Sequence, residues 1–242
     1  MAGDAYEKGR PSYPAEAVDY LARELSLNRT SMMVELGAGT GKFTKLLVPM
    51  GAKLIAIEPV EGMRCKFKEI FPQIELHEGT AEAIPLPDES ADAVIAAQAF
   101  HWFSGESTLK EIHRVLKPGG LIGLIWNVRD ESKDWVAQLT KIIYAYDSEA
   151  PTYNSMKWRK AFDHTSLFTS LKYTSFAHQH EGTPDTVVAR VASISFIAVL
   201  PEKKKTEVLS RVAQLIQTHP EIKGLKQISF PYRTDIYWCK KK

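Results

Sequence analysis

Short apolar segments alternate with longer amphipathic segments along the first half of the chain, and this alternation restricts the folds open to it. The segments with a strand pattern are brief and apolar on both faces, as strands buried between two helix layers must be. They lie at residues 32–37, 53–59, 74–80, 91–99 and 121–127. Helical patterns lie at 15–25, 42–50, 61–71 and 106–116. The alternation predicts a parallel sheet with helices on both faces.

The second half of the chain has a less regular pattern. The run Lys117-Pro118-Gly119-Gly120 predicts the end of a helix, because proline has no amide hydrogen and glycine frees the backbone to enter the next strand. Residues 129–170 are polar, aromatic and helical in pattern, and helices are predicted at 184–200 and 202–218. Two further strands are predicted at 172–180 and 227–239, and we expect the last one to close the sheet.

Composition excludes several classes of protein. The 242 residues suit one domain with an embedded cap, and a formal net charge of +2 gives no reason to expect a nucleic-acid partner. We interpret the lysines at 203–205 as the solvated start of a helix and those at 240–242 as a solvated terminus, rather than as a patch that binds nucleic acid or a membrane. No stretch reaches the roughly 18 apolar residues of a membrane helix, so no membrane partner is expected. The first ten residues show no apolar leader, and we expect a cytoplasmic protein, monomeric or homodimeric.

No metal site is expected from the cysteine and histidine pattern. Cys65 and Cys239 are far apart in the sequence and form neither a disulfide framework nor a zinc motif. His178 and His180 share one face of a predicted strand, but two imidazoles without a third ligand are poor grounds for a metal.

The strongest single motif is a glycine loop between the first predicted strand and the following helix. Glycines at 37, 39 and 41 let the backbone turn sharply and approach a ligand, and amides at a helix start can face that ligand. The P-loop pattern fails because Leu36 stands five residues before Gly41 and Phe43 follows Lys42. The dinucleotide pattern fails because Lys42 takes the place of its last glycine. What remains is acid-x-Gly-x-Gly-x-Gly, beginning at Glu35.

This loop resembles the first motif of class I S-adenosylmethionine (SAM)-dependent methyltransferases. The resemblance implies that the loop wraps the methionine part of SAM and that Glu35 orders that site. It assigns Glu35, Gly37, Ala38, Gly39 and Gly41 to cofactor binding. Glu58 ends the second predicted strand about 20 residues beyond the loop, where a carboxylate accepts from the ribose hydroxyls. By resemblance, Glu58 anchors the ribose; otherwise it is an exposed loop acid.

Three further segments support the same resemblance, in the family's order. Residues 79–87 resemble the segment that covers adenine, which assigns contacts to Thr80 and Ala81. Residues 90–99 resemble the fourth-strand motif, whose ligand-facing end holds Gln98 and Ala99. Residues 116–120 match the turn before the fifth strand. The implied fold is α/β: a Rossmann-like seven-stranded sheet with an antiparallel last strand, helices on both faces and a helical cap over the carboxyl edge.

Residues 100–103 (Phe-His-Trp-Phe) and 6–14 resemble a subgroup that includes trans-aconitate methyltransferases and yeast cantharidin-resistance-type enzymes. By that resemblance the N-terminal segment folds over the cofactor as a lid, with Tyr6 and Arg10 as contacts; the alternative is a disordered terminus. Substrate contacts are assigned to Tyr13, His101, Trp102 and Arg129. The resemblance weakens beyond residue 129, so the subgroup does not identify the substrate of this chain.

No catalytic residue is required by the expected chemistry. SAM is already activated, so transfer by in-line displacement needs alignment and desolvation, and an ionised carboxylate acceptor needs no general base. His101 is the candidate base, but it is equally open to holding an anionic substrate or to making a structural hydrogen bond. Trp102 could pack rather than contact substrate, and Arg129 could be an exposed loop residue.

The sequence therefore predicts a SAM-dependent methyltransferase that acts on a small molecule, with carboxylates first among the acceptors. Its regions would be an N-terminal lid and helix (1–30), a SAM-binding core (31–128) and substrate-side additions (129–242). The alternatives are an RNA or protein methyltransferase and a SAM-binding protein without catalysis. A nicotinamide oxidoreductase is disfavoured by the glycine spacing and the absence of a redox dyad.

Overall fold

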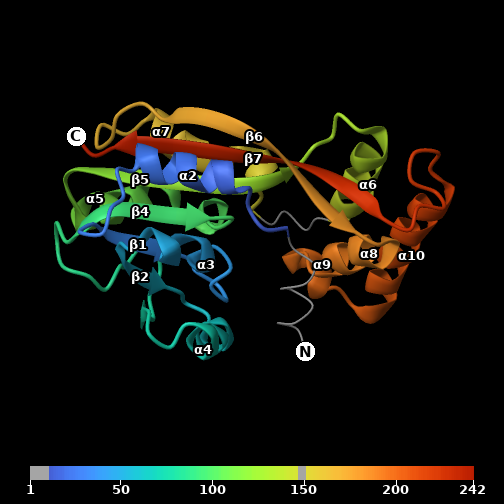
Figure 1. Ribbon diagram of the computed structural model, residues 1–242, viewed down its shortest axis with the longest axis horizontal. Coiled ribbons are helices and arrows are strands. Elements are labelled where there is room, and N and C mark those ends of the chain that lie inside the picture. The colour runs from blue at the N-terminus through green and yellow to red at the C-terminus, as the bar shows by residue number, and fades with distance from the viewer. Residues whose placement is uncertain (1–10, 147–150) are drawn as a thin grey trace. The chain divides into compact units, whose positions relative to one another are not determined.

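The computed structural model describes residues 11–146 and 151–242 (Figure 1). Its contacts divide the chain into two compact units. Unit 2 comprises Tyr13–Trp126, Pro151–Phe176 and Thr234–Lys242. Unit 1 comprises, among the described residues, 11–12, 127–146 and 177–233. The predicted lid residues Tyr6 and Arg10 lie outside the described residues.

A seven-stranded sheet has the strand order β3-β2-β1-β4-β5-β7-β6. Its strands are β1 (Met32–Leu36), β2 (Lys53–Ile57), β3 (Glu75–His77), β4 (Ala91–Ala97), β5 (Leu116–Arg129), β6 (Lys172–Gly182) and β7 (Ile228–Lys240). Strands β1 to β5 pair in parallel. The amide of Lys241 donates to Gly120 and that of Asp130 to Pro231, so β7 runs antiparallel to β5. The predicted mixed, Rossmann-like sheet is confirmed.

The last strand does not close the sheet, and that part of the prediction is wrong. Strand β7 lies between β5 and β6, which leaves β6 at the edge. Burial explains the order. Residues 234–239 of β7 are all buried, as an inner strand must be, whereas β6 alternates exposed and half-buried side chains and carries polar groups that suit an edge.

The helices largely follow the predicted ranges. Those of unit 2 are α2 (Ala15–Glu24), α3 (Thr44–Leu47), η1 (Val48–Met50), α4 (Glu61–Ile70), η2 (Phe100–Trp102), α5 (Gly105–Val115), η3 (Tyr153–Ser155), η4 (Lys157–Arg159) and α7 (Lys160–Asp163). Those of unit 1 are α6 (Asp134–Tyr144), α8 (Pro184–Ala192), α9 (Ser195–Ala198) and α10 (Glu202–Thr218). The range of α10 agrees with the prediction at both ends.

Three boundaries differ from the predictions. The predicted helix 42–50 is an α-helical turn followed by a 3₁₀ turn, with Pro49 in the first turn of the latter. The predicted helix 184–200 is broken at residues 193–194. The run 117–120 does end a helix, but it belongs to β5, where Leu116 pairs with Ala91 and an irregularity follows before the regular register resumes.

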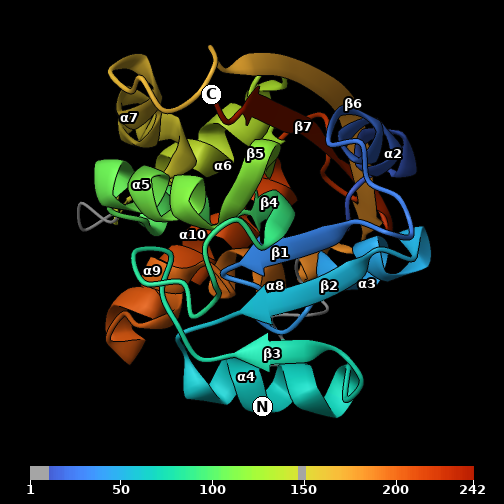
Figure 2. The same ribbon diagram turned by 90° about the vertical axis from the view of Figure 1, so that its left-hand side faces the viewer.

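Helices cover both faces of the sheet within unit 2 (Figure 2). Helices α2 and α3 pack on one face, with Leu21 and Leu47 in a core that also holds Met33 and Ile95. A Cβ at Gly123 would lie 2.8 Å from side-chain carbons of Leu21, in α2, and of Leu25, the residue that follows it, so the absence of a side chain there lets α2 approach β5 closely. Helix α5 lies on the other face (Figure 2).

Unit 1 has a core of its own. Helices α6, α8 and α10 bury aliphatic side chains against the first part of β7, and the ring of Trp135 meets that of Phe230 edge-on at 4.8 Å. Its members are Trp135, Val136, Leu139, Ile143, Val187, Val191, Ile197, Val208, Val212, Leu215, Ile216, Ile222, Ile228, Phe230 and Tyr232. The predicted helices of the second half are thus confirmed as amphipathic elements with a buried face.

Candidate functional site

The glycine loop is a tight turn at the carboxyl end of β1. Gly37, Gly39 and Gly41 have φ angles of 66°, 60° and 89°, a region that side chains disfavour. The amides of Gly37 and Ala38 both donate to the carbonyl of Ile57, at 2.9 and 3.2 Å, which ties the loop to the end of β2. The loop is therefore held by backbone bonds that do not depend on a ligand.

The three glycines face different surroundings. A Cβ at Gly37 would stand 2.9 Å from that of Ala99, and one at Gly41 would collide with the ring of Phe71. Among the residues that the structure describes, a Cβ at Gly39 would have one neighbour within 4 Å, the sulfur of Met63 at 4.0 Å. Gly37 and Gly41 are thus required by packing, whereas the described residues leave room beside Gly39 for a ligand to approach the backbone.

Glu58 is a buried carboxylate held by two loops. One oxygen accepts from the amide of Gly39 at 2.8 Å and the other from that of Val60 at 2.9 Å, and the residue is 4% exposed. Each oxygen retains a second lone pair, so the carboxylate can also accept a pair of hydroxyl groups. Arg64 of α4 donates to the main-chain carbonyls of Glu58 and Pro59, and these hydrogen bonds fix the backbone that follows β2.

Glu35 is buried beneath the loop. Its carboxyl group accepts a hydrogen bond from the hydroxyl of Thr44 at 2.6 Å. Burial raises the pKa of Glu35 to about 8, and the charge of Glu58 adds to this rise while the Thr44 hydrogen bond opposes it. Glu35 is therefore protonated at neutral pH, and its neutral carboxyl group is buried beneath the loop.

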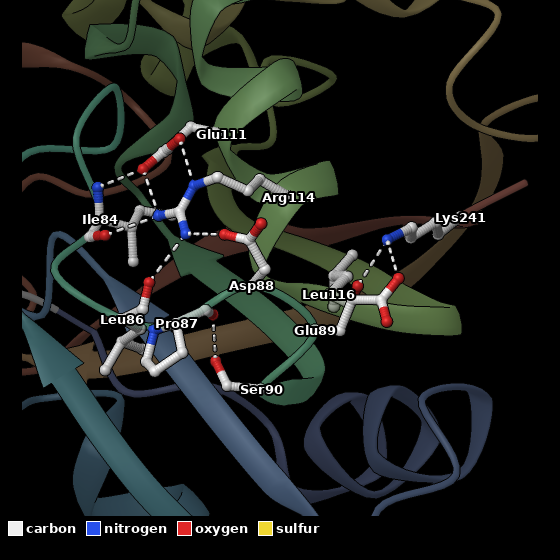
Figure 3. A network of polar contacts seen from close by, with 10 residues as sticks. All are labelled: Ile84, Leu86, Pro87, Asp88, Glu89, Ser90, Glu111, Arg114, Leu116 and Lys241. Carbon is white, nitrogen blue, oxygen red and sulfur yellow. Dashed lines mark hydrogen bonds and ion pairs between the residues drawn. The ribbon is translucent and has the colours of Figure 1, made fainter.

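The segment that resembles an adenine cover is anchored from α5 (Figure 3). Arg114 donates to the carbonyls of Ile84 and Leu86 at 2.9 Å each and pairs with Asp88 at 2.7 Å. Glu111 accepts from the amide of Ile84 and from Arg114. One arginine thus fixes the path of residues 84–88, and Ala81 upstream is buried while Thr80 is exposed.

The carboxyl end of β4 brings the fourth-strand residues next to the loop. Gln98 has a φ of 54°, a strained conformation for a residue with a side chain, and its amide donates to Ile125. Ala99 touches Gly37 as described above. The 3₁₀ turn η2 follows, in which Trp102 is 49% exposed and His101 is half-buried. The indole nitrogen of Trp126 donates to Nδ1 of His101 at 3.1 Å.

Most of the predicted site residues come together in unit 2. Glu35, Gly37, Ala38, Gly39, Gly41, Glu58, Gln98, Ala99, His101 and Trp102 stand at or beyond the carboxyl ends of β1, β2 and β4, which is where open α/β sheets bind ligands. Tyr13 is 8% exposed and packs edge-on against Phe43, so its ring lies in the core beside the loop. Arg129 belongs to unit 1, where its Nε donates to Thr140.

Known proteins match both the sequence and the fold. A family model described as a methyltransferase domain matches residues 34–124. An uncharacterized methyltransferase-like protein of Schizosaccharomyces pombe is 39% identical over 95% of this chain and 90% of its own length. An uncharacterized methyltransferase of Mycobacterium tuberculosis is also 39% identical, with the same coverage of both chains. The chain belongs to the class I SAM-dependent methyltransferases.

Solved structures agree with the fold of this methyltransferase. A protein of Anabaena variabilis, described as a methyltransferase from antibiotic biosynthesis, has a TM-score of 0.71 and 24% identity, covering 95% of this chain and 98% of its own. A geranyl diphosphate methyltransferase, solved in complex with SAM, has a TM-score of 0.54 and 10% identity, covering 94% and 85%. Identities this low show a shared fold.

Several supporting residues of the methyltransferase escaped the sequence analysis. Arg64, Glu82, Arg114 and Trp126 hold the loops by hydrogen bonds across 6 to 30 positions in the sequence. Trp126 offered one signal, since a tryptophan at the end of a buried strand needs a partner for its indole N–H. The arginines offered none, because a charged residue on an amphipathic helix is ordinarily solvated.

Two findings bear on other kinds of site. Over residues 11–146 and 151–242, no helix combines the length and apolarity needed to span a membrane. Over the same ranges, His, Cys, Asp and Glu side chains form no group of three or more placed to hold a metal ion. Nδ1 of His180 is hydrogen-bonded to Arg190.

Proposed function

We propose that this methyltransferase binds SAM at the loops of unit 2 and methylates a small-molecule acceptor, with carboxylates first among the candidates. The observation that carries the cofactor assignment is Glu58. Its carboxylate is buried and oriented by Gly39 and Val60, and the room that the described residues leave beside Gly39 lies on the same loop. A buried carboxylate held in this way suits a diol, and the cofactor's ribose provides one.

The residues present fit the cofactor. Gly37, Ala38 and Gly39 would hold its amino-acid part, with Glu35 ordering the loop from beneath. Thr80 and Ala81 would lie along its adenine side, and Gln98 and Ala99 would face it from the carboxyl end of β4. Bound SAM supplies a methyl group on a sulfonium sulfur that an acceptor displaces in line. The chain's own residues align the acceptor and exclude water.

A small acceptor is supported by charge and by the surface of η2. A net charge of +2 gives no reason to expect a polyanionic acceptor. Trp102 exposes an aromatic face next to His101, with ring centroids 5.3 Å apart, which suits a small molecule that carries polar and apolar parts. The trans-aconitate-like subgroup remains the guide to the first acceptors to try, and a cytoplasmic location, a monomer or homodimer, and a lid that includes Tyr6 and Arg10 remain predictions.

Isothermal titration with SAM, with NAD as control ligand, tests the cofactor assignment. We expect micromolar binding of SAM and none of NAD. Glu58→Ala should weaken SAM binding by about 1–3 kcal/mol, the scale of lost hydrogen bonds to a charged group. Glu61→Ala removes an exposed acid three residues away and is the matched control, expected to bind as wild type. Absence of SAM binding by the folded protein, or equal affinity of both variants, would remove the basis of the proposal.

A further inference from the structure

Two segments of unit 2 are joined by the side chain of Glu82. The first is the turn that holds Thr80 and Ala81, and it is closed by a hydrogen bond from the amide of Ala83 to the carbonyl of Thr80, at 3.2 Å. The second begins at Ser104, the residue before α5. The Glu82 carboxylate accepts from the amide of Ser104 at 2.7 Å, across 22 positions in the sequence. The turn after β3 and the start of α5 are therefore linked directly.

The same carboxylate oxygen holds the first turn of α5. It accepts a second hydrogen bond, at 3.0 Å, from the hydroxyl of Thr108. Ser104 takes the N-cap position of this helix, where backbone amides need an acceptor from outside the helix. A negative charge is also favourable there, because it faces the positive end of the helix dipole. Glu82 thus serves α5 as a cap that comes from another segment of the chain.

The link through Glu82 carries a charge at neutral pH. Burial opposes ionisation, but the hydrogen bonds from the Ser104 amide and the Thr108 hydroxyl outweigh it, so the pKa of Glu82 lies below its usual range. The side chain of Thr80 adds to this effect. An ionised acceptor binds an amide more strongly than a neutral one does.

The turn η2 lies between this link and the glycine loop. The ring of Phe103, the residue before Ser104, is 3.5 Å from the point where a Cβ of Gly37 would stand. The side chain of Ala99, before η2, is 2.9 Å from the same point. Contacts to the loop thus flank η2 at both ends, and Glu82 holds the backbone directly beyond the second end.

We propose that Glu82 is a positioning residue that couples cofactor binding to the order of η2 and of the first turn of α5. This role rests on the proposed function, which assigns adenine contacts to Thr80 and Ala81 and an acceptor to the surface of η2. A cofactor that fixes the turn at residues 80–83 also fixes the Glu82 carboxylate, and the carboxylate holds the amide of Ser104. The acceptor side is then fully ordered only after the cofactor has bound, so the acceptor binds second.

Coupling differs from simple capping in a measurable way. A cap with a purely structural role stabilises α5 equally in the free and the cofactor-bound protein. Coupling requires that the contribution of Glu82 differs between these two states, because a coupling free energy is such a difference. The quantity to measure is therefore the response of η2 and α5 to the cofactor, with and without Glu82.

Amide hydrogen exchange of the full chain measures this response, with and without saturating S-adenosylhomocysteine, the product form of the cofactor. The reporter amides are those of residues 104–109. Thr108 and Leu109 are fully buried, so a ligand does not touch them directly. We expect S-adenosylhomocysteine to slow exchange at the reporter amides by about fivefold or more, the low end of common coupling energies. Peptides of α10 belong to unit 1 and should not respond.

Variants of Glu82 show whether the response passes through its carboxylate. In Glu82→Ala the Ser104 amide should exchange roughly 10- to 100-fold faster, as expected for a lost hydrogen bond to a charged group, and the ligand should no longer slow the reporter amides. Glu82→Gln keeps an acceptor oxygen and should keep part of the response. Glu106→Ala removes an acid of the same helical turn that pairs with Lys110, and this control should respond as wild type. Equal responses of wild type and Glu82→Ala would overturn the proposal.

Trp102 gives an independent readout on the acceptor side. It is 49% exposed, whereas the other four tryptophans of the chain are at most 7% exposed, so iodide quenches mainly the fluorescence of Trp102. Trp102→Phe identifies its share of the signal. With S-adenosylhomocysteine bound, Glu82→Ala should raise the quenching constant of Trp102, and Glu106→Ala should leave it unchanged. An unchanged constant in Glu82→Ala would show that the order of η2 does not depend on Glu82.

A milder variant covers the case in which Glu82→Ala does not fold. Thr108→Val removes one donor to Glu82 and keeps the shape of the side chain, so the response of the reporter amides should be reduced; a full response would contradict the proposal. Calorimetry of the wild type with S-adenosylhomocysteine separates the two possible failures. Binding without a response of the reporter amides would overturn the coupling and leave the proposed function intact, whereas no binding would overturn both.

Discussion

At the scale of single residues, the site is a set of backbone amides and buried carboxyl groups that fix one another. Glu58 links the loops after β1 and β2, because one oxygen binds the amide of Gly39 and the other binds that of Val60. Glu35 lies beneath, protonated at neutral pH because burial raises its pKa to about 8. The loop is therefore preorganised, and a ligand need not supply the free energy to shape it.

The glycines of the loop should respond differently to the same substitution. Gly39→Val places its side chain where the described residues leave room, at a φ of 60°, so the fold should survive at a cost of about 1–3 kcal/mol in strain while SAM binding is lost. Gly41→Val instead drives a side chain into Phe71 and should unfold the loop region. Circular dichroism melts and calorimetry on both variants check this. Retained SAM binding in Gly39→Val would show that the ligand does not approach the loop there.

Glu35 makes the stability of the ligand-free protein depend on pH. Its pKa is about 8 in the fold and near 4.5 when unfolded, so the unfolded chain releases this proton first as pH rises. The contribution is fully present below pH 4.5 and is lost as pH rises toward 8, by about 3–5 kcal/mol at most. Urea unfolding from pH 5 to 8.5 should show that Glu35→Gln becomes more stable relative to wild type as pH rises. A constant difference between the two across this range would mean that Glu35 is ionised in the fold.

At the scale of elements, helix α5 has a second task beyond covering the sheet. Through Arg114 and Glu111 it holds the strandless segment 84–88 by main-chain carbonyls and an amide (Figure 3). A segment without regular structure needs such partners for its buried polar groups. The helix thus sets the position of the segment proposed to cover the adenine.

Removal of that anchor should loosen the segment. Arg114→Met deletes the hydrogen bonds to Ile84 and Leu86 but keeps the side chain's apolar length, and we expect a loss of about 1–3 kcal/mol in stability together with weaker SAM binding. Lys110→Met, on the same helix, breaks only the exposed pair with Glu106 and should cost less than about 1 kcal/mol. Thermal melts and SAM titrations compare the two. Similar results for both variants would show that the anchor is dispensable.

Elements with one strong local pattern were predicted well from the sequence. The strands at the start of the sheet, the loop glycines and helix α10 follow from apolar periodicity and glycine spacing, which are local properties. The order of β7 and β6 was not accessible, because it depends on which strand buries both faces after pairing. The bond from Trp126 to His101 was missed for a related reason: the partners are 25 residues apart and meet only when β4 and β5 pair.

At the scale of the whole molecule, the described residues form two compact units, each with a core of its own. The core of unit 1 is built from α6, α8 and α10 with the first part of β7, whereas the glycine loop and Glu58 belong to unit 2. Strands β5, β6 and β7 contribute residues to both units. We expect local stability to follow the cores rather than the order of the sequence.

Hydrogen exchange can separate the two cores. Trp135→Ala should cost about 3–5 kcal/mol and reduce protection mainly in peptides of α8 and α10, because Trp135 is buried against Phe230. Phe67→Ala should give the opposite pattern, with losses near the loop, because Phe67 packs on Phe71 in unit 2. SAM affinity should fall in the second variant and stay close to wild type in the first. Uniform loss of protection in both would mean that the molecule opens as one cooperative unit.

The place of β7 has a consequence for how the protein is made. This strand follows β6 in the sequence but lies between β5 and β6 in the sheet. On the ribosome, β6 emerges before β7, the strand that joins it to the rest of the sheet, and its backbone groups remain without these partners until β7 has left the exit tunnel. Asp235, on β7, arrives equally late. Until then, the hydroxyl groups of Tyr153 and Tyr173 lack the carboxylate to which they donate in the folded protein. A nascent chain stalled before β7 would contain every residue of the glycine loop but would lack the strand that joins β6 to the rest of the sheet.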